Sequence, residues 1–241
     1  MKVFYINLDT ATVRKNKFED KQYCRFRAFT RDEVPEILDK KMTSMYNYPR
    51  ANHLSRCACW LSHTQLLEKI VKENLEDVLI LEDDAIQVNP IPIDYPKDGI
   101  VYVGGFIYNK KMMIETPPEI THKKGINLCP PEYRILGTLA YIIPTPDIAL
   151  KILNRIYSSK RYKAIDIMYG NLDQGTSAIK QYYNYPGSFR EEGCPSQISP
   201  NKNKIQTEDY EFISINKYKR CQVTMDPEKK QVERKKLMHK D

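Results

Sequence analysis

Short apolar runs alternate with polar and amphipathic stretches along this chain. Val3–Leu8 is an apolar run that predicts a buried strand, and Asp9 ends it. The lysine-rich stretch Thr12–Asp20 predicts a solvent-facing helix after that strand. Between Phe29 and Asn52 the pattern is irregular and contains two prolines. This region is therefore expected to be a loop-rich insertion with at most short helices.

A clear helical period follows this insertion. Apolar residues recur every three or four positions within Arg56–Asn74, which predicts a helix with one buried face. Three more strands are predicted at Val78–Leu81, Gly99–Gly105 and Leu139–Ile143, and a second helix at Pro146–Ile156. Beyond Tyr182 the chain is rich in proline and glycine, which indicates loops.

Strands that alternate with helices predict an α/β fold with a mostly parallel sheet flanked by helices. The length of 241 residues, of which 41% are hydrophobic, suits one large domain, which we expect at residues 1–215. Residues 216–241 carry nine Lys or Arg against four Asp or Glu, so this basic tail supplies +5 of the net charge of +7. Such a tail is typical of a solvated or frayed end, and it also suits contact with nucleic acid or an acidic membrane surface.

The chain contains six cysteines, and their expected redox state depends on the cellular compartment. The start MKVFYINLD does not have the pattern of a signal peptide, and no stretch approaches the roughly 20 apolar residues of a membrane span. We therefore expect reduced thiols and a soluble, cytoplasmic protein. Cys57 and Cys59 are separated by one residue and lack a matching second pair, so packing in the core explains them better than a zinc site.

Polar residues follow two of the predicted strands at their carboxyl ends, where α/β sheets bind ligands. Asn7 and Asp9 follow the first strand, and Glu82-Asp83-Asp84 follows the strand Val78–Leu81. Adjacent carboxylates repel one another, and a divalent cation with a preference for oxygen ligands, such as magnesium or manganese, relieves that repulsion. A solvated turn is the other interpretation of such a triplet.

Six motifs together resemble glycosyltransferase family 25, the family of bacterial lipooligosaccharide galactosyltransferases and collagen hydroxylysine galactosyltransferases. They are YINLD with Arg14 downstream, CACWLSH, LILEDDA, GTLAYIIP, AIDIMYG and YPGSFREEGCPSQIS, and they run in the family's order from residue 3 to about residue 199. The chain departs from the family at Leu139, where many members have histidine, and at Gln197, where aspartate is common.

The resemblance implies a GT-A fold, a UDP-sugar donor, a divalent metal (Mn²⁺ or Mg²⁺) and inversion at the anomeric carbon. The sugar would be galactose or glucose, and the acceptor hydroxyl would belong to a glycan, a lipid-linked sugar or a protein. Inversion requires a base that deprotonates the acceptor while the metal stabilises the departing diphosphate. No sequence pattern indicates an oligomeric state.

The motifs also imply roles for particular residues. Asp84 is the expected metal ligand, while Glu82 and Asp83 would bind the metal or the ribose. Asp166 is the candidate base, although aspartate is also a favoured helix cap. The remaining candidates for contact with the nucleotide-sugar are Asn7, Leu8, Arg14, Ser62, His63 and Tyr141.

Two of these candidates keep a structural alternative. His63 is equally well explained as a structural histidine bonded to a loop carbonyl. Tyr141 suits either stacking on a sugar or base, or packing in the core.

Two other functions compete with transfer. One is a non-catalytic or nucleic-acid-binding protein that uses the basic tail, although no known reader motif accompanies its charges. The other is a phosphate-handling hydrolase with the same carboxylates and magnesium, but no obvious nucleophile follows the strand.

Overall fold

The structure is a computed structural model that describes residues 1–42, 50–111, 114–115, 123–175 and 178–192. These residues all belong to one compact unit, Met1–Lys204. The basic tail 216–241 and Gln197 lie outside the described residues. Within the described part, no helix combines the length and the apolar character needed to cross a membrane.

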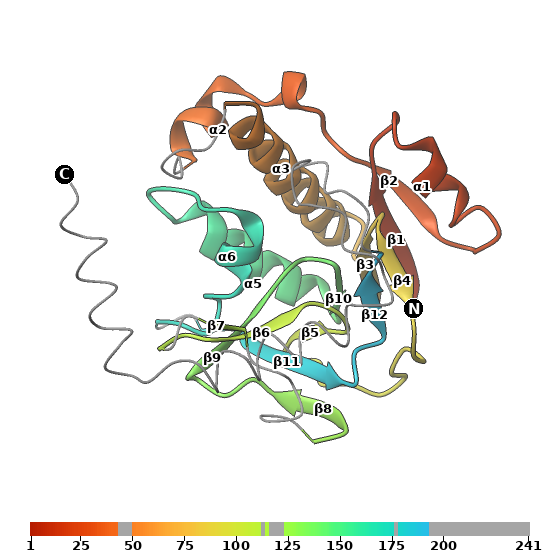
Figure 1. Ribbon diagram of the computed structural model, residues 1–241. Coiled ribbons are helices and arrows are strands. Elements are labelled where there is room, and N and C mark those ends of the chain that lie inside the picture. Colours follow the sequence, from red (N-terminus) through yellow and green to blue (C-terminus); the bar gives the residue numbers. More distant parts are fainter. Residues whose placement is uncertain (43–49, 112–113, 116–122, 176–177, 193–241) are drawn as a thin grey trace, which may run out of the picture. The chain divides into compact units, whose positions relative to one another are not determined.

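A seven-stranded sheet lies at the centre of this unit, with the strand order β2-β1-β3-β10-β5-β11-β8 (Figure 1). Its strands are β1 (Lys2–Asn7), β2 (Cys24–Arg27), β3 (Val78–Glu82), β5 (Gly99–Tyr102), β8 (Gly125–Leu128), β10 (Ala140–Ile143) and β11 (Lys180–Tyr185). The pairings give β10 and β8 the opposite direction to the other strands. The predicted α/β fold with a mostly parallel sheet is thus confirmed.

Two smaller sheets flank the main one. In the first, β4 (Ala85–Gln87) pairs with β12 (Phe189–Glu191), and in the second β6 (Phe106–Asn109) pairs with both β7 (Ile114–Glu115) and β9 (Tyr133–Leu136). The prediction of loops beyond Tyr182 is wrong for β11 and β12. Both are short strands whose partners lie far away in the sequence, so a local pattern does not reveal them.

The helices are α1 (Thr12–Asn16), α2 (Glu36–Lys41), α3 (Arg50–Lys72), α5 (Pro146–Tyr157) and α6 (Ile165–Tyr169), with a 3₁₀ turn, η1, at Arg31–Glu33. Helices α1, α3 and α5 match the predicted helical segments with different ends, α2 is a short helix of the loop-rich region, and α6 was not predicted. Helix α1 is shorter than predicted, and α3 begins earlier. Asn74 follows α3 with φ of 50°, a left-handed conformation that commonly ends a helix.

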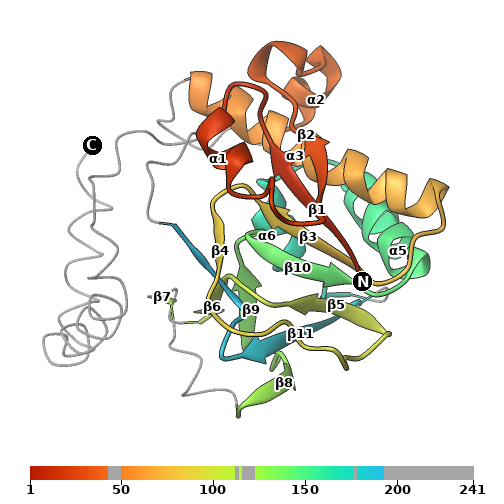
Figure 2. The ribbon, with the colours of Figure 1, turned by 90° about the vertical axis from the view of Figure 1, so that its right-hand side faces the viewer.

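Both faces of the central strands of the main sheet are buried. Along β1, Phe4 and Ile6 belong to the larger core cluster, which includes residues of α3 and α5, and Tyr5 belongs to the other cluster. Figures 1 and 2 show α3 and α5 side by side on one face of the sheet. On the opposite face, Phe18 and Tyr95 from flanking segments complete the smaller cluster. This double burial explains why the central strands read as apolar runs.

Strands β1 and β3 are adjacent and parallel, with Ile6 opposite Glu82. Their carboxyl ends therefore meet at one edge of the sheet. Helix α3 passes over the same region on one face. These three elements position most of the polar side chains described next.

Candidate functional site

A cavity of about 510 Å³ opens where β1 and β3 end. It contains seven of the residues that the sequence singled out: Leu8, Arg14, Ser62, His63, Glu82, Asp83 and Asp84. The rest of its described lining is Ile6, Thr10, Ala28, Phe29, Thr30, Arg31, Asp32, Ser55, Ala58 and Cys59. Residues from Ala28 to Asp32 fall at the edge of the irregular region, where no periodic signal marked them.

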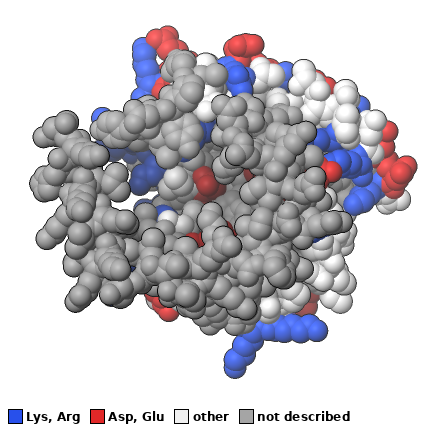
Figure 3. Space-filling model, in the orientation of Figure 1, with Lys and Arg blue, Asp and Glu red and all other residues white. Residues whose placement is uncertain are grey.

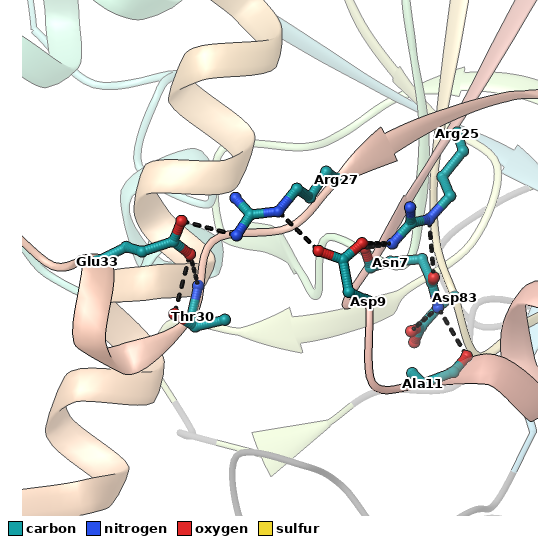
Figure 4. Close-up of polar contacts among 8 residues, drawn as sticks. All are labelled: Asn7, Asp9, Ala11, Arg25, Arg27, Thr30, Glu33 and Asp83. Carbon is teal, nitrogen blue, oxygen red and sulfur yellow. Dashed lines mark hydrogen bonds and ion pairs between the residues drawn. The ribbon is translucent and has the colours of Figure 1, made fainter.

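Asp83 is held by protein groups on both of its carboxylate oxygens. The Asn7 side-chain amide donates to Oδ2 at 2.8 Å (Figure 4). Arg14 donates to Oδ1 at 2.7 Å. Asn7 in turn accepts a hydrogen bond from Arg25 at 3.1 Å and is only 1% exposed. Asn7 therefore lies behind the cavity wall, where it orients Asp83 and, through it, Arg14.

Asp9 has a different place from Asn7. Its carboxylate pairs with Arg25 at 2.5 Å and Arg27 at 2.8 Å, and Arg27 continues to Glu33 at 2.7 Å (Figure 4). The hydrogen bonds from Arg25 and Arg27 lower the pKa of Asp9. Its side chain is 56% exposed and is not part of the cavity lining. This chain of ion pairs joins the end of β1 to β2 and η1.

The Asp84 carboxyl group has fewer protein partners than that of Asp83. Its Oδ1 is buried and has no hydrogen-bond partner in the described part of the chain, and its Oδ2 lies 3.8 Å from Arg14. Burial, followed by the nearby charge of Glu82, raises the pKa of Asp84 to about 7. A buried carboxylate oxygen without a partner is what a cation site requires, so the residues present fit a divalent metal.

Glu82 belongs to a buried hydrogen-bonded chain. Its Oε1 accepts from the Thr138 hydroxyl and lies 3.4 Å from His63 Nε2. Although burial opposes the ionised form, the contacts with His63 and Thr138 outweigh it and lower the pKa of Glu82. His63 Nδ1 contacts the Tyr141 hydroxyl at 2.8 Å, and that hydroxyl lies 3.4 Å from Tyr169. Tyr141 is fully buried, which agrees with the core alternative rather than stacking on a ligand.

Ser62 shapes the wall of the cavity. Its hydroxyl donates to the Ala58 carbonyl one turn earlier at 2.8 Å and accepts from the Phe29 backbone N–H at 2.9 Å. The side chain is buried, with 2% exposed. Ser62 therefore attaches the segment after β2 to helix α3.

Asp166 lies in a second cavity of about 410 Å³. The described lining is Arg56, Cys59, Glu82, Phe106, Gly137, Thr138, Leu139, Ala164, Ile165, Asp166, Ile167 and Glu191. Burial raises the pKa of Asp166, and the hydrogen bond from the Ile167 N–H at 2.8 Å opposes this shift. The N-cap of α6 is Ala164, so Asp166 lies in the first turn rather than at the cap.

Cys57 and Cys59 face different surroundings, because two residues of a helix turn the side chain by about 200°. The ligand atoms of Cys57 lie within 4.8 Å of those of His53 and Asp39, and Cys59 stands in the same relation to His63 and Glu82. The sequence did not identify Cys59 as a site residue, yet it lines both cavities. The four-residue spacing from Cys59 to His63 was the available signal.

The profile of glycosyltransferase family 25, described as an LPS biosynthesis protein, matches residues 1–90. The family resemblance found in the sequence is thus confirmed over the segment that contains β1, α3 and the Glu82-Asp83-Asp84 cluster, and it supports a glycosyltransferase. No curated protein matches the chain.

Solved structures that are similar to this chain include two with low sequence identity. A glycosyltransferase involved in glycosylation of the major capsid of PBCV-1 is 10% identical, with 66% of this chain and 67% of that chain covered and a TM-score of 0.29. A nucleoside-diphosphate-sugar pyrophosphorylase from Vibrio cholerae RC9 is 14% identical, with coverages of 76% and 71% and a TM-score of 0.31. At these TM-scores neither structure adds to the assignment.

Proposed function

We propose that this chain transfers galactose or glucose from a UDP-sugar to an acceptor hydroxyl, with inversion and with the help of a divalent metal, on a GT-A type of fold. The observation that supports this most strongly is the buried, unpartnered Oδ1 of Asp84 beside Glu82 and Arg14. These residues line the larger cavity, and all three lie in the segment that matches the family.

Asp84 and Glu82 would hold the metal, Mn²⁺ or Mg²⁺, through carboxylate oxygens. When bound, such a metal neutralises charge on the departing diphosphate. Asp83 is already engaged with Asn7 and Arg14, so its role is to orient Arg14. The Arg14 guanidinium supplies a permanent positive charge next to the position proposed for the diphosphate.

The rest of the larger cavity suits the nucleotide. Leu8 and Ser62 form parts of its wall, and His63 fixes the position of Glu82. The volume of about 510 Å³ falls within the usual range for small-molecule sites. The hydrogen-bonded chain of Glu82, His63 and Tyr141 keeps this wall rigid, which lowers the entropic cost of binding.

Asp166 is the proposed base that accepts the proton of the acceptor hydroxyl. It is largely buried, yet it lines a cavity that shares Glu82 with the donor side. A raised pKa strengthens a carboxylate as a base, provided that it remains ionised at the working pH.

A donor screen tests the proposal. Release of UDP is measured for a panel of UDP-sugars with and without Mn²⁺, and we expect release to depend on Mn²⁺ and to favour UDP-galactose or UDP-glucose. Calorimetric titration of UDP with and without Mn²⁺ provides a second, activity-independent measurement. The proposal is refuted if no UDP-sugar releases UDP and UDP does not bind in the presence of Mn²⁺.

A further inference from the structure

The two cavities adjoin at Glu82 and Cys59, which line both of them. If the larger cavity binds the donor, the sugar to be transferred has to lie near this junction. The smaller cavity is then the neighbouring space that contains Asp166, the group proposed to take the proton. The inference below rests on the proposed function, because it takes the larger cavity as the donor site and Asp166 as the base.

An aromatic ring forms part of the wall of the smaller cavity. Phe106, at the start of β6, is 37% exposed, although aromatic side chains are normally well buried. Gly137 lies next to it, and a Cβ at this position would be 3.5 Å from the ring atom Cδ2 of Phe106. Gly137 has φ of +89°, which disfavours any side chain there. The ring is therefore supported by bare backbone on one side and remains accessible within the cavity.

Such a ring is suited to a sugar. The face of an aromatic ring carries partial negative charge, and the C–H groups of a pyranose carry partial positive charge. Covering the exposed ring with the apolar side of a pyranose also removes both surfaces from water. Polar groups around the ring can then bind the hydroxyls at the edge of the sugar.

The charged groups of this cavity are mostly acidic. Glu82, Asp166 and Glu191 provide three carboxyl groups against one guanidinium, from Arg56. Among the described residues, acidic side chains are visible near the middle of the face in Figure 3. Carboxylates accept hydrogen bonds from sugar hydroxyls, but they repel a carboxylate or phosphate on the incoming molecule.

We propose that the smaller cavity is the acceptor subsite and that it takes a pyranoside without an acidic group, with Phe106 as the surface on which the sugar ring lies. Phe106 determines acceptor affinity in this arrangement, and Asp166 and Glu191 select against anionic acceptors. The sequence motifs predict neither the ring surface nor the selection against anionic acceptors. Phe106 and Glu191 are far from each other in the sequence, and both are far from Glu82-Asp83-Asp84.

The first test uses methyl glycosides as acceptors, with UDP release measured at saturating UDP-sugar and Mn²⁺. We expect glucoside, galactoside and glucosaminide to accelerate release above the rate in water, and glucuronide to do so at least about tenfold less well, a factor that corresponds to about 1.4 kcal/mol. Equal acceleration by glucuronide, or no acceleration by any glycoside while slow Mn²⁺-dependent release continues, overturns the inference. The latter results leave the proposed function intact, whereas loss of all Mn²⁺-dependent release contradicts both.

The second test replaces the ring. Phe106→Ala should raise KM for the glycoside on the order of tenfold and leave KM for the UDP-sugar within about twofold, whereas Phe106→Tyr should restore acceptor KM. Leu128→Ala is the matched control, because Leu128 is also an exposed apolar residue, at 55%, but belongs to neither cavity lining. An unchanged acceptor KM in Phe106→Ala, or an equal rise in donor KM, shows that Phe106 is not the acceptor platform.

Discussion

Asp83 and Asp84 are chemically alike and adjacent, but the structure gives them different environments. The oxygens of Asp83 are bonded to Asn7 and Arg14, whereas Oδ1 of Asp84 has no partner in the described part of the chain. A change at Asp83 would release Arg14, while a change at Asp84 would remove the proposed metal ligand without disturbing a hydrogen bond of Oδ1. Replacement of Asp83 should therefore affect the position of Arg14, whereas replacement of Asp84 should affect binding of the metal.

The first prediction is that Asp84→Asn abolishes transfer, weakens Mn²⁺-dependent binding of UDP and leaves the protein folded. The pKa of Asp84 in the folded protein, about 7, is above the ordinary value of 3.8, so the folded state loses stability as pH rises between these values. Without divalent cations, the variant should gain stability relative to the parent more at pH 8 than at pH 5, as measured by denaturant unfolding. Asp94→Asn, a change of the same charge on the surface, is the control. A fully active Asp84→Asn variant would contradict the metal assignment.

The second prediction concerns Asp166, whose carboxyl group lines the smaller cavity and accepts the Ile167 N–H. Asn retains the shape and an acceptor oxygen but cannot take a proton. We expect kcat to fall on the order of 10²–10⁴-fold, with little change in affinity for the UDP-sugar.

Initial rates and calorimetric titration of Mn²⁺ and UDP separate the three roles that Asp166 could have. A joint loss of Mn²⁺ affinity and rate indicates a metal ligand, and near-parent activity removes Asp166 from the catalytic residues. In the latter case its carboxylate serves only the first turn of α6, where asparagine acts nearly as well.

The third prediction is that Cys57→Ser and Cys59→Ser, made separately, keep the donor specificity and metal dependence of the parent. Cys57 is fully buried, so its replacement by a hydroxyl should lower stability by about 1–3 kcal/mol. Cys24→Ser, at a half-buried free thiol, is the control. Stoichiometric zinc in the parent that is lost in either variant would show that these thiols are ligands rather than packing groups.

At the scale of elements, uninterrupted apolar runs and helical periodicity decided what the sequence revealed. Helix α3 was predicted because its apolar residues recur over a long segment, and β3 because its buried residues form an apolar run. Strands β6 and β9 each contain a polar residue, Asn109 or Arg134, and each pairs with a partner more than 20 residues away. The pairing of β6 with β9 determines where Phe106 lies, and no local sequence pattern predicts this.

The fourth prediction tests the pairing of β5 with β11. A Cβ on Gly99 would lie 2.2 Å from the Lys180 carbonyl oxygen, so the two backbones would have to separate. Gly99→Ala should destabilise the protein by about 3 kcal/mol, the upper part of the range for overpacking, as measured by thermal or denaturant unfolding. Gly187→Ala is the matched control, because its nearest neighbours would lie at the ordinary contact distance of 3.4 Å or more. Equal stability of the two variants would contradict this register.

At the scale of the whole molecule, the basic tail offers a test between the two classes of function. The fifth prediction is that deletion of residues 216–241 preserves Mn²⁺-dependent UDP release, because every residue of both described cavity linings precedes the tail. Nucleic-acid binding is measured in parallel by titration at several salt concentrations. Strong, salt-dependent binding that disappears on truncation, together with no transfer activity, would favour the nucleic-acid-binding alternative.

The sequence by itself determined the fold class, the adjacent carboxylates after β3 and the family resemblance, because each depends on residues close together in the chain. It also placed polar residues at the carboxyl ends of β1 and β3, and these ends meet because the two strands are adjacent and parallel. Only the tertiary structure decided that Asp83 is bonded while Asp84 is not, and that Tyr141 lies in the core behind His63. These outcomes depend on burial and on partners as far as 78 residues away, which a local pattern does not contain. The same holds for the smaller cavity, where Arg56, Phe106, Asp166 and Glu191 come together only through the packing of distant elements.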